Sequence, residues 1–302
     1  MKVAVIGIGS NSVRMLLGAI EDGVGRRLCR ERAGTRLFAG LDGQKRLQPE
    51  AMAKTAAAVS QMADSARKAG AERLHLFATS ATRDATNGAE FTALLRTMAG
   101  LETEILSGGE EARLSYLGAS EGRSCGVMDI GGGSTELVVG HDGVPAAGIS
   151  CQLGAVRLFR QLPLSSAEDV PAIIRYAREE INSRLEALQA EPLPGTWVGT
   201  GGTFTALAAL LRGTHWTDRA CMHGTLLTRV KVMEQTRKLA GMTVQERLQL
   251  PGLQPSRADI CVHGFCILLA CMEALSLDCV RVSEYGNLEG YLKKEYSLTS
   301  LT

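Results

Sequence analysis

Two segments rich in glycine and serine each lie between apolar runs that match one another. Residues 5–18 read VIGIGSNSVRMLLG and residues 127–140 read VMDIGGGSTELVVG, at a constant offset of 122 residues. An apolar run, a turn of small residues and a second apolar run predict a tight β-hairpin. A turn without bulky side chains lets backbone N–H groups and serine hydroxyls converge on an anion. Two copies in register favour phosphate-binding turns over plain hairpin turns.

The two turns supply a set of candidate phosphate donors through their backbone N–H groups and hydroxyls. These candidates are Ser10, Asn11 and Ser12 in the first turn, and Gly131, Gly132, Gly133 and Ser134 in the second. Arg83 is a further candidate, because a guanidinium matches a phosphate group with two parallel hydrogen bonds. Its neighbour Asp84 would hold it in place. The alternative is that Arg83 and Asp84 form a surface salt bridge.

Two carboxylates flank the second turn. Asp129 lies at the end of the apolar run before it, and Glu136 lies in the run after it. A carboxylate at a strand end, beside clustered phosphates, is a usual partner of Mg²⁺, directly or through water. A solitary buried acid in GVMDIGGG would be costly. We therefore predict that Asp129 and Glu136 bind Mg²⁺; the alternative for Glu136 is a strand residue facing solvent.

Helical and strand-like segments alternate along the chain and must position these groups. Apolar residues at helical spacing predict a helix over 50–69, and apolar runs predict strands at 74–80, 101–107 and 279–283. Further helices are expected at 87–100 (with Asn87 as N-cap), 109–119, 154–161, 166–190, 256–275 and the C-terminus, and residues 195–211 predict a strand, a glycine turn and a helix. This order indicates an α/β protein with two mixed sheets.

Composition narrows the class of protein. The chain has 302 residues, a formal net charge of +1 and 4% aromatic residues, which argues against a nucleic-acid binder and predicts no DNA partner. No apolar run is long enough to span a membrane, so no membrane partner is expected. The eight cysteines form no CxxC pair, and five of them lie in apolar runs. We interpret the cysteines as reduced and those in apolar runs as buried, in a cytoplasmic protein.

Five stretches together resemble the exopolyphosphatase and guanosine pentaphosphate phosphohydrolase family, which belongs to the actin-like ATPase superfamily. They are GSNSVRM at 9–15, ATSATRDATN at 78–87, SGGEEARLSYLGA at 107–119, DIGGGSTEL at 129–137 and GTGGTFTALA at 199–208. A weaker sixth stretch is LPGLQPSRADI at 250–260. The resemblance covers nearly the whole chain. The chain resembles the short form of the family, which lacks the metal-dependent HD domain.

The resemblance implies a fold and a set of roles. It implies two actin-like (ribonuclease H-like) domains with an interdomain cleft, which the repeat places at residues 1–121 plus 287–302 and at 122–286. It makes Glu111 the general base that activates water, and it adds Gly201, Gly202 and Thr203 to the phosphate-binding residues. The implied activity is Mg²⁺-assisted removal of the terminal phosphate of polyphosphate or guanosine pentaphosphate. The family also suggests a homodimer.

Position 7 departs from the family pattern. The family carries Asp two residues before the glycine of GSNS, whereas this chain has Gly7, which aligns with Asp129 in the internal repeat. We expect the missing carboxylate to weaken Mg²⁺ binding. This departure favours a second hypothesis, a catalytically weak sensor that binds a phosphorylated nucleotide. A third hypothesis, an actin-like kinase or ATPase, is opposed by SGGEEARLSYLGA.

Overall fold

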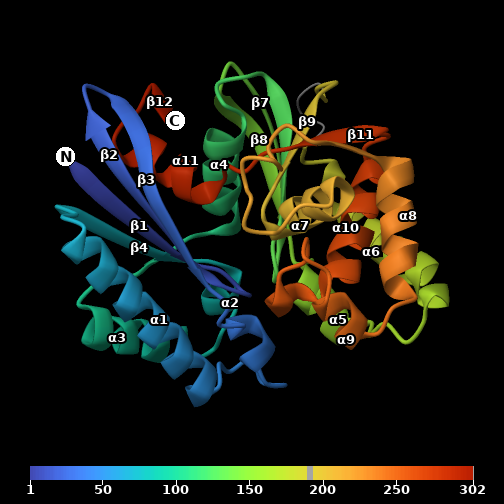
Figure 1. Ribbon diagram of the computed structural model, residues 1–302, viewed down its shortest axis with the longest axis horizontal. Coiled ribbons are helices and arrows are strands. Elements are labelled where there is room, and N and C mark those ends of the chain that lie inside the picture. Colours follow the sequence, from blue (N-terminus) through green and yellow to red (C-terminus); the bar gives the residue numbers. More distant parts are fainter. Residues whose placement is uncertain (189–192, 302) are drawn as a thin grey trace. The chain divides into compact units, whose positions relative to one another are not determined.

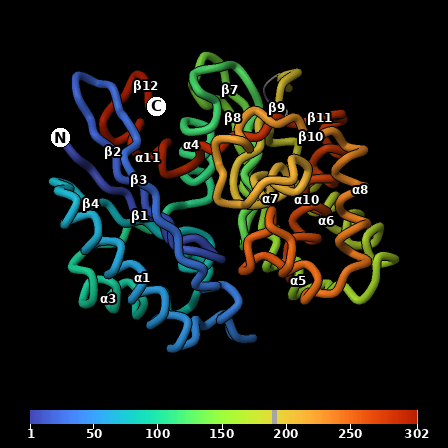
Figure 2. Tube along the Cα trace, viewed as in Figure 1, coloured from blue at the N-terminus to red at the C-terminus, as the bar shows by residue number. Residues whose placement is uncertain are grey.

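The chain folds into two compact units. A computed structural model describes residues 1–188 and 193–301. The first unit comprises Met1–Gly118 and Asn287–Thr302, and the second comprises Ala119–Gly286. The Cα trace in Figure 2 shows the last segment running beside the strands at the start of the chain, as the pairing of β12 (Ser300–Leu301) with β3 (Val24–Ala33) requires.

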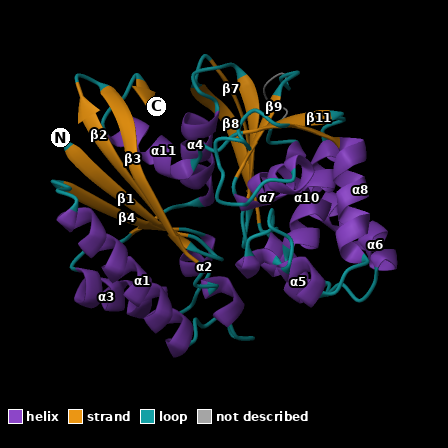
Figure 3. Cartoon of the chain, in the orientation of Figure 1, coloured by secondary structure: helices purple, strands orange, loops and turns teal. Residues whose placement is uncertain are grey.

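The first unit is built on a six-stranded mixed sheet of the order β12-β3-β2-β1-β4-β5, counted over the described residues. The remaining strands are β1 (Lys2–Ile8), β2 (Val13–Glu21), β4 (Arg73–Ala78) and β5 (Glu104–Ile105). The helices are η1 (Leu37–Gly40), α1 (Pro49–Lys68), α2 (Ser80–Arg83), α3 (Gly88–Ala99), α4 (Gly108–Ala119) and α11 (Asn287–Glu295). Helix α1 packs on β1, β2 and α3, and residues of α11 share a core with β1 and β2 (Figures 1 and 3).

The second unit repeats the same plan. Its six-stranded sheet has the order β10-β11-β9-β6-β7-β8 within the described residues. The strands are β6 (Cys125–Ile130), β7 (Thr135–His141), β8 (Val144–Cys151), β9 (Trp197–Thr200), β10 (Leu226–Thr228) and β11 (Cys279–Val282). The helices are α5 (Ala155–Gln161), η2 (Ala167–Asp169), α6 (Val170–Leu185), α7 (Gly202–Arg212), α8 (Arg229–Ala240), α9 (Val244–Leu248), η3 (Pro255–Arg257) and α10 (Cys261–Ala274). In both units the first two strands of the repeat form an antiparallel hairpin, β1–β2 or β6–β7. A later strand, β4 or β9, then pairs in parallel with the first strand of that hairpin.

The internal repeat is confirmed at the level of single hydrogen bonds. The hairpin β1–β2 turns through Gly9 and Ser12, and the hairpin β6–β7 turns through Gly131 and Ser134. In the first turn the N–H of Gly9 donates to the carbonyl of Ser12 at 3.0 Å, and in the second Gly131 donates to Ser134 at 3.0 Å. The two sequences therefore form the same turn twice.

Helix α10 explains the cysteine pattern. Apolar residues cover all its faces because it lies in the core of the second unit, where Cys261, Cys266 and Cys271 are buried. Burial raises the pKa of Cys261 to about 11 and that of Cys266 to about 12. All eight cysteines are free thiols; five are buried, including the three of α10, as predicted for cysteines in apolar runs, whereas Cys29, Cys221 and Cys279 are exposed. No helix in the described part of the chain has the length and apolarity needed to cross a membrane.

Several predicted boundaries are wrong in extent. The strand expected at 101–107 is reduced to Glu104–Ile105, because most of this segment is a loop that leads into α4. The helix expected at 256–275 starts as the 3₁₀ turn η3, and α10 proper begins only at Cys261. The helix expected at 166–190 likewise starts as η2; α6 ends at Leu185, and residues 189–190 lie outside the described residues.

His263 on α10 gives the fold a pH dependence that can be measured. Its buried Nε2 donates to the carbonyl of Leu162 at 2.8 Å, and burial lowers its pKa because the charged imidazole would lose its hydration. Below the unfolded pKa of about 6.5, the unfolded chain gains a proton that the folded chain does not. The free energy of unfolding should therefore decrease as the pH falls below that value, with a slope of at most about 1.4 kcal/mol per pH unit from this residue.

Urea unfolding of the wild type and of His263→Leu between pH 7.5 and 5.5 measures this effect. In His263→Leu the free energy of unfolding should depend less on pH than in the wild type. The matched variant His215→Leu changes an exposed histidine and should keep the pH dependence of the wild type. Parallel pH curves for the wild type and His263→Leu would contradict the assignment.

Candidate active site

The first turn is held from behind by the segment around η1. The carbonyls of Ser10 and Asn11 accept hydrogen bonds from the N–H groups of Phe38 and Arg36 at 2.9 and 3.1 Å. A trans peptide places its N–H opposite its carbonyl. The N–H groups of Asn11 and Ser12 therefore point away from η1, as anion binding by this turn requires.

The second turn is held in the same way by the start of α5. The carbonyl of Gly131 accepts from the N–H of Ala155 at 3.0 Å, and that of Gly132 accepts from Val156 at 2.8 Å. The N–H groups of Gly132 and Gly133 consequently point away from α5. The close contact also needs a glycine on the α5 side, since a Cβ at Gly154 would lie 2.4 Å from the carbonyl carbon of Gly132.

Asp129 and Glu136 lie directly opposite each other on β6 and β7. Side chains at such positions are neighbours on one face of a sheet. Both residues are buried, and the hydroxyl of Ser150 donates to Glu136 Oε1 at 2.8 Å. Asp129 Oδ1 lies against the backbone of Gly201, where a Cβ would approach it to 2.7 Å. Gly201 has φ +91°, so it combines close approach with a backbone conformation that suits glycine.

The prediction that Asp129 and Glu136 bind Mg²⁺ can be compared with the ligands that this ion usually takes. Mg²⁺ usually keeps several waters and is held by one or two carboxylates together with substrate phosphates. No group of three or more histidine, cysteine or acidic side chains able to hold a metal ion occurs among residues 1–188 and 193–301. An ion held by Asp129 and Glu136 would need its remaining ligands from substrate and water.

Glu111 and Arg83 are brought together in the first unit. Glu111 lies in the first turn of α4, is only 7% exposed, and accepts from Arg83 Nη1 at 3.3 Å. The same Nη1 donates to the carbonyl of Leu106 at 2.7 Å, and Arg83 Nε lies 3.9 Å from Asp84 Oδ1. Arg83 Nη2 is buried and makes no hydrogen bond within the described part of the chain. This geometry holds a guanidinium beside a buried carboxylate.

Glu110 has a different role from its neighbour. Its carboxylate accepts the N–H of Ser107 at 2.8 Å, and its own N–H donates to the Ser107 hydroxyl at 3.2 Å. These reciprocal bonds close the start of α4 as a capping box does. Hydrogen bonds from Ser107 also lower the pKa of the Glu110 carboxyl. Glu110 thus stabilises the helix start that carries Glu111.

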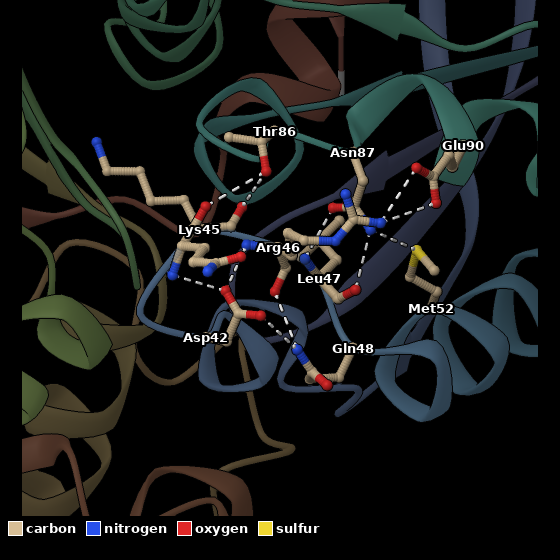
Figure 4. A network of polar contacts seen from close by, with 10 residues as sticks. Asp42, Lys45, Arg46, Leu47, Gln48, Met52, Thr86, Asn87 and Glu90 are labelled. Carbon is tan, nitrogen blue, oxygen red and sulfur yellow. Dashed lines mark hydrogen bonds and ion pairs between the residues drawn. The ribbon is translucent and has the colours of Figure 1, made fainter.

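The stretch 78–87 makes hydrogen bonds to the first turn and to the segment that precedes α1. The hydroxyls of Ser10 and Ser80 are hydrogen-bonded at 2.8 Å, which joins the turn to the start of α2. Asn87 occupies the N-cap position of α3, as predicted, but its side chain makes no capping hydrogen bond to that helix. Instead it donates to the carbonyl of Leu47 at 3.0 Å and accepts the N–H of Leu47 at 2.8 Å (Figure 4).

Removing the Asn87 side chain should therefore destabilise the first unit. Asn87→Ala leaves a buried N–H and a buried C=O of Leu47 without partners, which costs about 1–3 kcal/mol for each group. The neighbouring Thr86→Ala is a matched control, because the exposed Thr86 hydroxyl makes long hydrogen bonds to the carbonyls of Gln44 at 3.3 Å and Lys45 at 3.5 Å, in an exposed part of the chain. Chemical denaturation should show a loss of at least about 2 kcal/mol for Asn87→Ala. Equal losses for the two variants would contradict this role.

The loop after β9 carries the last predicted phosphate-binding residues. Thr203 is buried and its hydroxyl donates to the carbonyl of Ile130 at 3.4 Å. A Cβ at Gly202 would lie 1.9 Å from Arg257 Nη2, so the Arg257 guanidinium lies directly against this glycine. Sequence reasoning gave Arg257 no role, although the stretch 250–260 contains it. The sequence offered one signal for Arg257, because it is an arginine in a stretch that resembles the family. The contact of Arg257 with Gly202, however, depends on how η3 packs against α7.

Comparison with known proteins extends these observations. The Ppx/GppA phosphatase family matches residues 19–298. Exopolyphosphatase 2 of Mycobacterium tuberculosis is 34% identical, over 96% of this chain and 97% of that protein. The guanosine-5'-triphosphate,3'-diphosphate pyrophosphatase of Photobacterium profundum is 29% identical, over 95% of this chain and 58% of that protein. The Ppx/GppA enzyme of Aquifex aeolicus is 30% identical with a TM-score of 0.80, over 97% and 99% of the two chains.

The paired sheets with their repeated hairpin turns, together with these structural relatives, define an α/β protein built from two actin-like domains. An exopolyphosphatase-like protein of known structure shares the fold, with a TM-score of 0.89 and 26% identity over 98% of this chain and 99% of that one. The chain belongs to the Ppx/GppA phosphatase family. This confirms the resemblance that the five stretches indicate.

Proposed function

We propose that the chain is a phosphohydrolase that removes the terminal phosphate of inorganic polyphosphate or the 5′ γ-phosphate of guanosine pentaphosphate. The observation that carries this proposal is the buried Glu111 with Arg83 beside it, in a family whose relatives are named exopolyphosphatase and guanosine pentaphosphate pyrophosphatase. A carboxylate held in this way can accept a proton from water while the guanidinium holds a phosphate oxygen.

The proposed reaction is a direct attack of water and needs no covalent intermediate with the enzyme. A water oxygen forms a bond to the terminal phosphorus, and the bond from that phosphorus to the bridging oxygen breaks. Glu111 takes the water proton, and the leaving chain keeps the bridging oxygen. The N–H groups of the two turns and the hydroxyls of Ser10, Ser12 and Ser134 hold the phosphate oxygens in our proposal, and Gly201, Gly202 and Thr203 contribute from the loop after β9.

Asp129 and Glu136 would hold Mg²⁺. When bound, Mg²⁺ neutralises charge on the phosphoryl oxygens and orients the group that is transferred. The two buried carboxylates lie on one face of the sheet, and the Ser150 hydroxyl fixes one of them. Only substrate oxygens and water need to complete such a site.

The cellular setting is part of the proposal. We propose that the protein does not bind DNA, which its net charge of +1 supports, and that it is cytoplasmic, which its free cysteines support.

We also propose a homodimer, as the family resemblance implies. Analytical ultracentrifugation of the whole chain tests the dimer, and a single monomeric species at micromolar concentration would contradict it.

Initial rates on long polyphosphate, tripolyphosphate and guanosine pentaphosphate test the activity. With Mg²⁺ we expect orthophosphate and a product shortened by one phosphate from at least one of these substrates, and chelation should stop its release. Tight binding without turnover of all three would instead support the phosphonucleotide sensor, which the missing carboxylate at Gly7 favours. Release of pyrophosphate or internal fragments would contradict attack at the chain end.

A further inference from the structure

Strand β8 lies at one end of the second sheet, and no strand pairs with its outer edge in the part of the chain that the structure describes. The unpaired edge of a strand presents backbone N–H and C=O groups to which another strand can bind. In the first unit the equivalent strand of the repeat, β3, is paired along its outer edge with β12 at Val24 and Gly25. The repeat thus points to β8 as an edge that can still accept a strand.

The two outer strands differ in charge. Five positions of β3 carry charged side chains: Arg26, Arg27, Arg30, Glu31 and Arg32. Charges on an exposed edge discourage its pairing with another chain. Strand β8 reads VPAAGISC and has no charged residue. An edge strand of this length without a charge indicates that β8 is not protected against a partner strand.

Only the first part of β8 carries features that hinder pairing. Pro145 has no N–H to donate, and the register with β7 shifts next to Val139 and Gly140. From Ala147 to Cys151 each residue pairs with β7 in regular register. This regular part of the edge is where a partner strand can bind.

A groove of about 630 Å³ lies beside the regular part of β8. Gly148, Ile149 and Ser150 line one side of it, and the end of α6 with the residues after it, including Arg184 and Glu186, lines the other. Gly148 is exposed, and Ile149 packs into the core that β8 shares with α6. Arg184 and Glu186 are exposed and carry opposite charges. The groove therefore combines a backbone edge with one cation and one anion.

We propose that two copies of the chain pair through β8, antiparallel and centred on Ile149, to form one continuous sheet. This inference rests on the homodimer of the proposed function and assigns its surface. The pairing sets Gly148 opposite Ser150 of the partner subunit, where backbone groups can form hydrogen bonds across the axis. A two-fold axis brings the same patch of both subunits together, so the patch must complement itself.

The charges of the groove meet this requirement. The two-fold axis is perpendicular to the continued sheet, so the two copies of α6 lie on the same face of it. Arg184 of one subunit then faces Glu186 of the partner subunit, and the same pair forms a second time across the axis. Strand β8 itself brings no charge that would repel its copy. An unrelated acidic or basic segment would satisfy only one of the two charges, which favours a second copy as the occupant.

Sedimentation velocity of the whole chain over a range of micromolar concentrations tests the strand pairing. Gly148→Lys should raise the dissociation constant of the dimer at least about tenfold, because the two lysines lie diagonally across the axis at roughly 7–8 Å and repel each other. Gly148→Ala is the matched control and should leave the dimer unchanged, because its Cβ would meet Val138 Cγ2 at an ordinary contact distance of 3.4 Å. A folded Gly148→Lys variant that dimerises like the wild type would overturn the pairing.

Charge reversal tests the same surface without changing the strand. Arg184→Glu and Glu186→Arg should each weaken the dimer about tenfold, since each places like charges across the axis twice. The double variant restores opposite charges and should return the dissociation constant to within about threefold of the wild-type value. Arg175→Glu changes an exposed arginine of α6 outside the groove and, as the control, should have no effect. Equally weak dimers in both single variants and the double variant would overturn the charge pairing.

The outcomes separate the surface from the homodimer itself. If the wild type dimerises and none of these variants weakens the dimer, the homodimer stands and the β8 interface is wrong. If the wild type stays monomeric throughout, both the homodimer and the interface are wrong, whatever its activity on phosphate substrates.

Discussion

Glu111→Gln is expected to lower kcat by about 10²–10⁴-fold, the usual contribution of a general base. Glutamine keeps the size of the side chain and an oxygen that can accept from Arg83, but it cannot take a proton from water at neutral pH. Substrate affinity should therefore change little. Steady-state release of orthophosphate gives kcat, and equilibrium binding of the same substrate gives the dissociation constant.

Glu110→Gln is the matched control for this experiment. The two glutamates are adjacent, but the Glu110 carboxylate accepts the N–H of Ser107 at the start of α4. Its replacement should cost about 0.3–1 kcal/mol of stability through the helix start and leave kcat near the wild-type value. Wild-type turnover in Glu111→Gln, or an equal loss of turnover in both variants, would contradict the assigned role.

Asp129→Asn is the second change with a large expected effect. Asparagine fits the same space against Gly201, so the variant should fold, but it removes one of the two negative charges proposed to hold Mg²⁺. Loss of a supporting residue around a metal site typically costs 10–100-fold in metal affinity, and loss of a ligand should cost at least about 100-fold. The Mg²⁺ concentration at half-maximal activity should rise accordingly.

Asp278→Asn controls for the loss of charge in the same unit, because the Asp278 side chain is 96% exposed and its carboxylate makes only a 3.8 Å ion pair with Arg229. Its Mg²⁺ dependence should match that of the wild type. An unchanged Mg²⁺ dependence in Asp129→Asn, in a variant shown to be folded by circular dichroism, would contradict the metal assignment.

Local sequence patterns predicted the parts of the fold that depend on neighbouring residues. The hairpins around Gly9 and Gly131 follow from small residues between apolar runs, and the repeat itself indicated two similar units. Helix α1 follows from the spacing of Ala56, Val59 and Met62, which are all buried. Such features need no knowledge of distant contacts.

Contacts between distant segments could not be predicted in this way. Asn87 binds Leu47, 40 residues earlier, instead of capping the helix that it precedes. Phe77 fills the position at Gly7 only because β1 and β4 pair in one particular register. Both side chains follow ordinary rules for their type, but the partner is chosen by the tertiary fold.

For the candidate site, too, residue identities could be predicted from the sequence, whereas contacts between the residues could not. Residue types and the family resemblance identified Glu111, Arg83, Asp129 and Glu136, whose roles remain predictions. The structure adds what no spacing reveals: Arg83 bonds to Glu111, and Asp129 and Glu136 lie opposite each other. The contact of Arg257 with Gly202 was missed, because the two residues belong to separate helical segments that meet only in the folded chain.

Hydrolysis in ¹⁸O-labelled water tests the central claim, that water attacks the terminal phosphorus, most directly. The wild type is incubated with Mg²⁺ and tripolyphosphate under single-turnover conditions, and the products are analysed by mass spectrometry. Attack on the terminal phosphorus predicts one ¹⁸O atom in each released orthophosphate and none in the pyrophosphate that remains. Label in the pyrophosphate with unlabelled orthophosphate would place the attack on the wrong phosphorus and contradict the account.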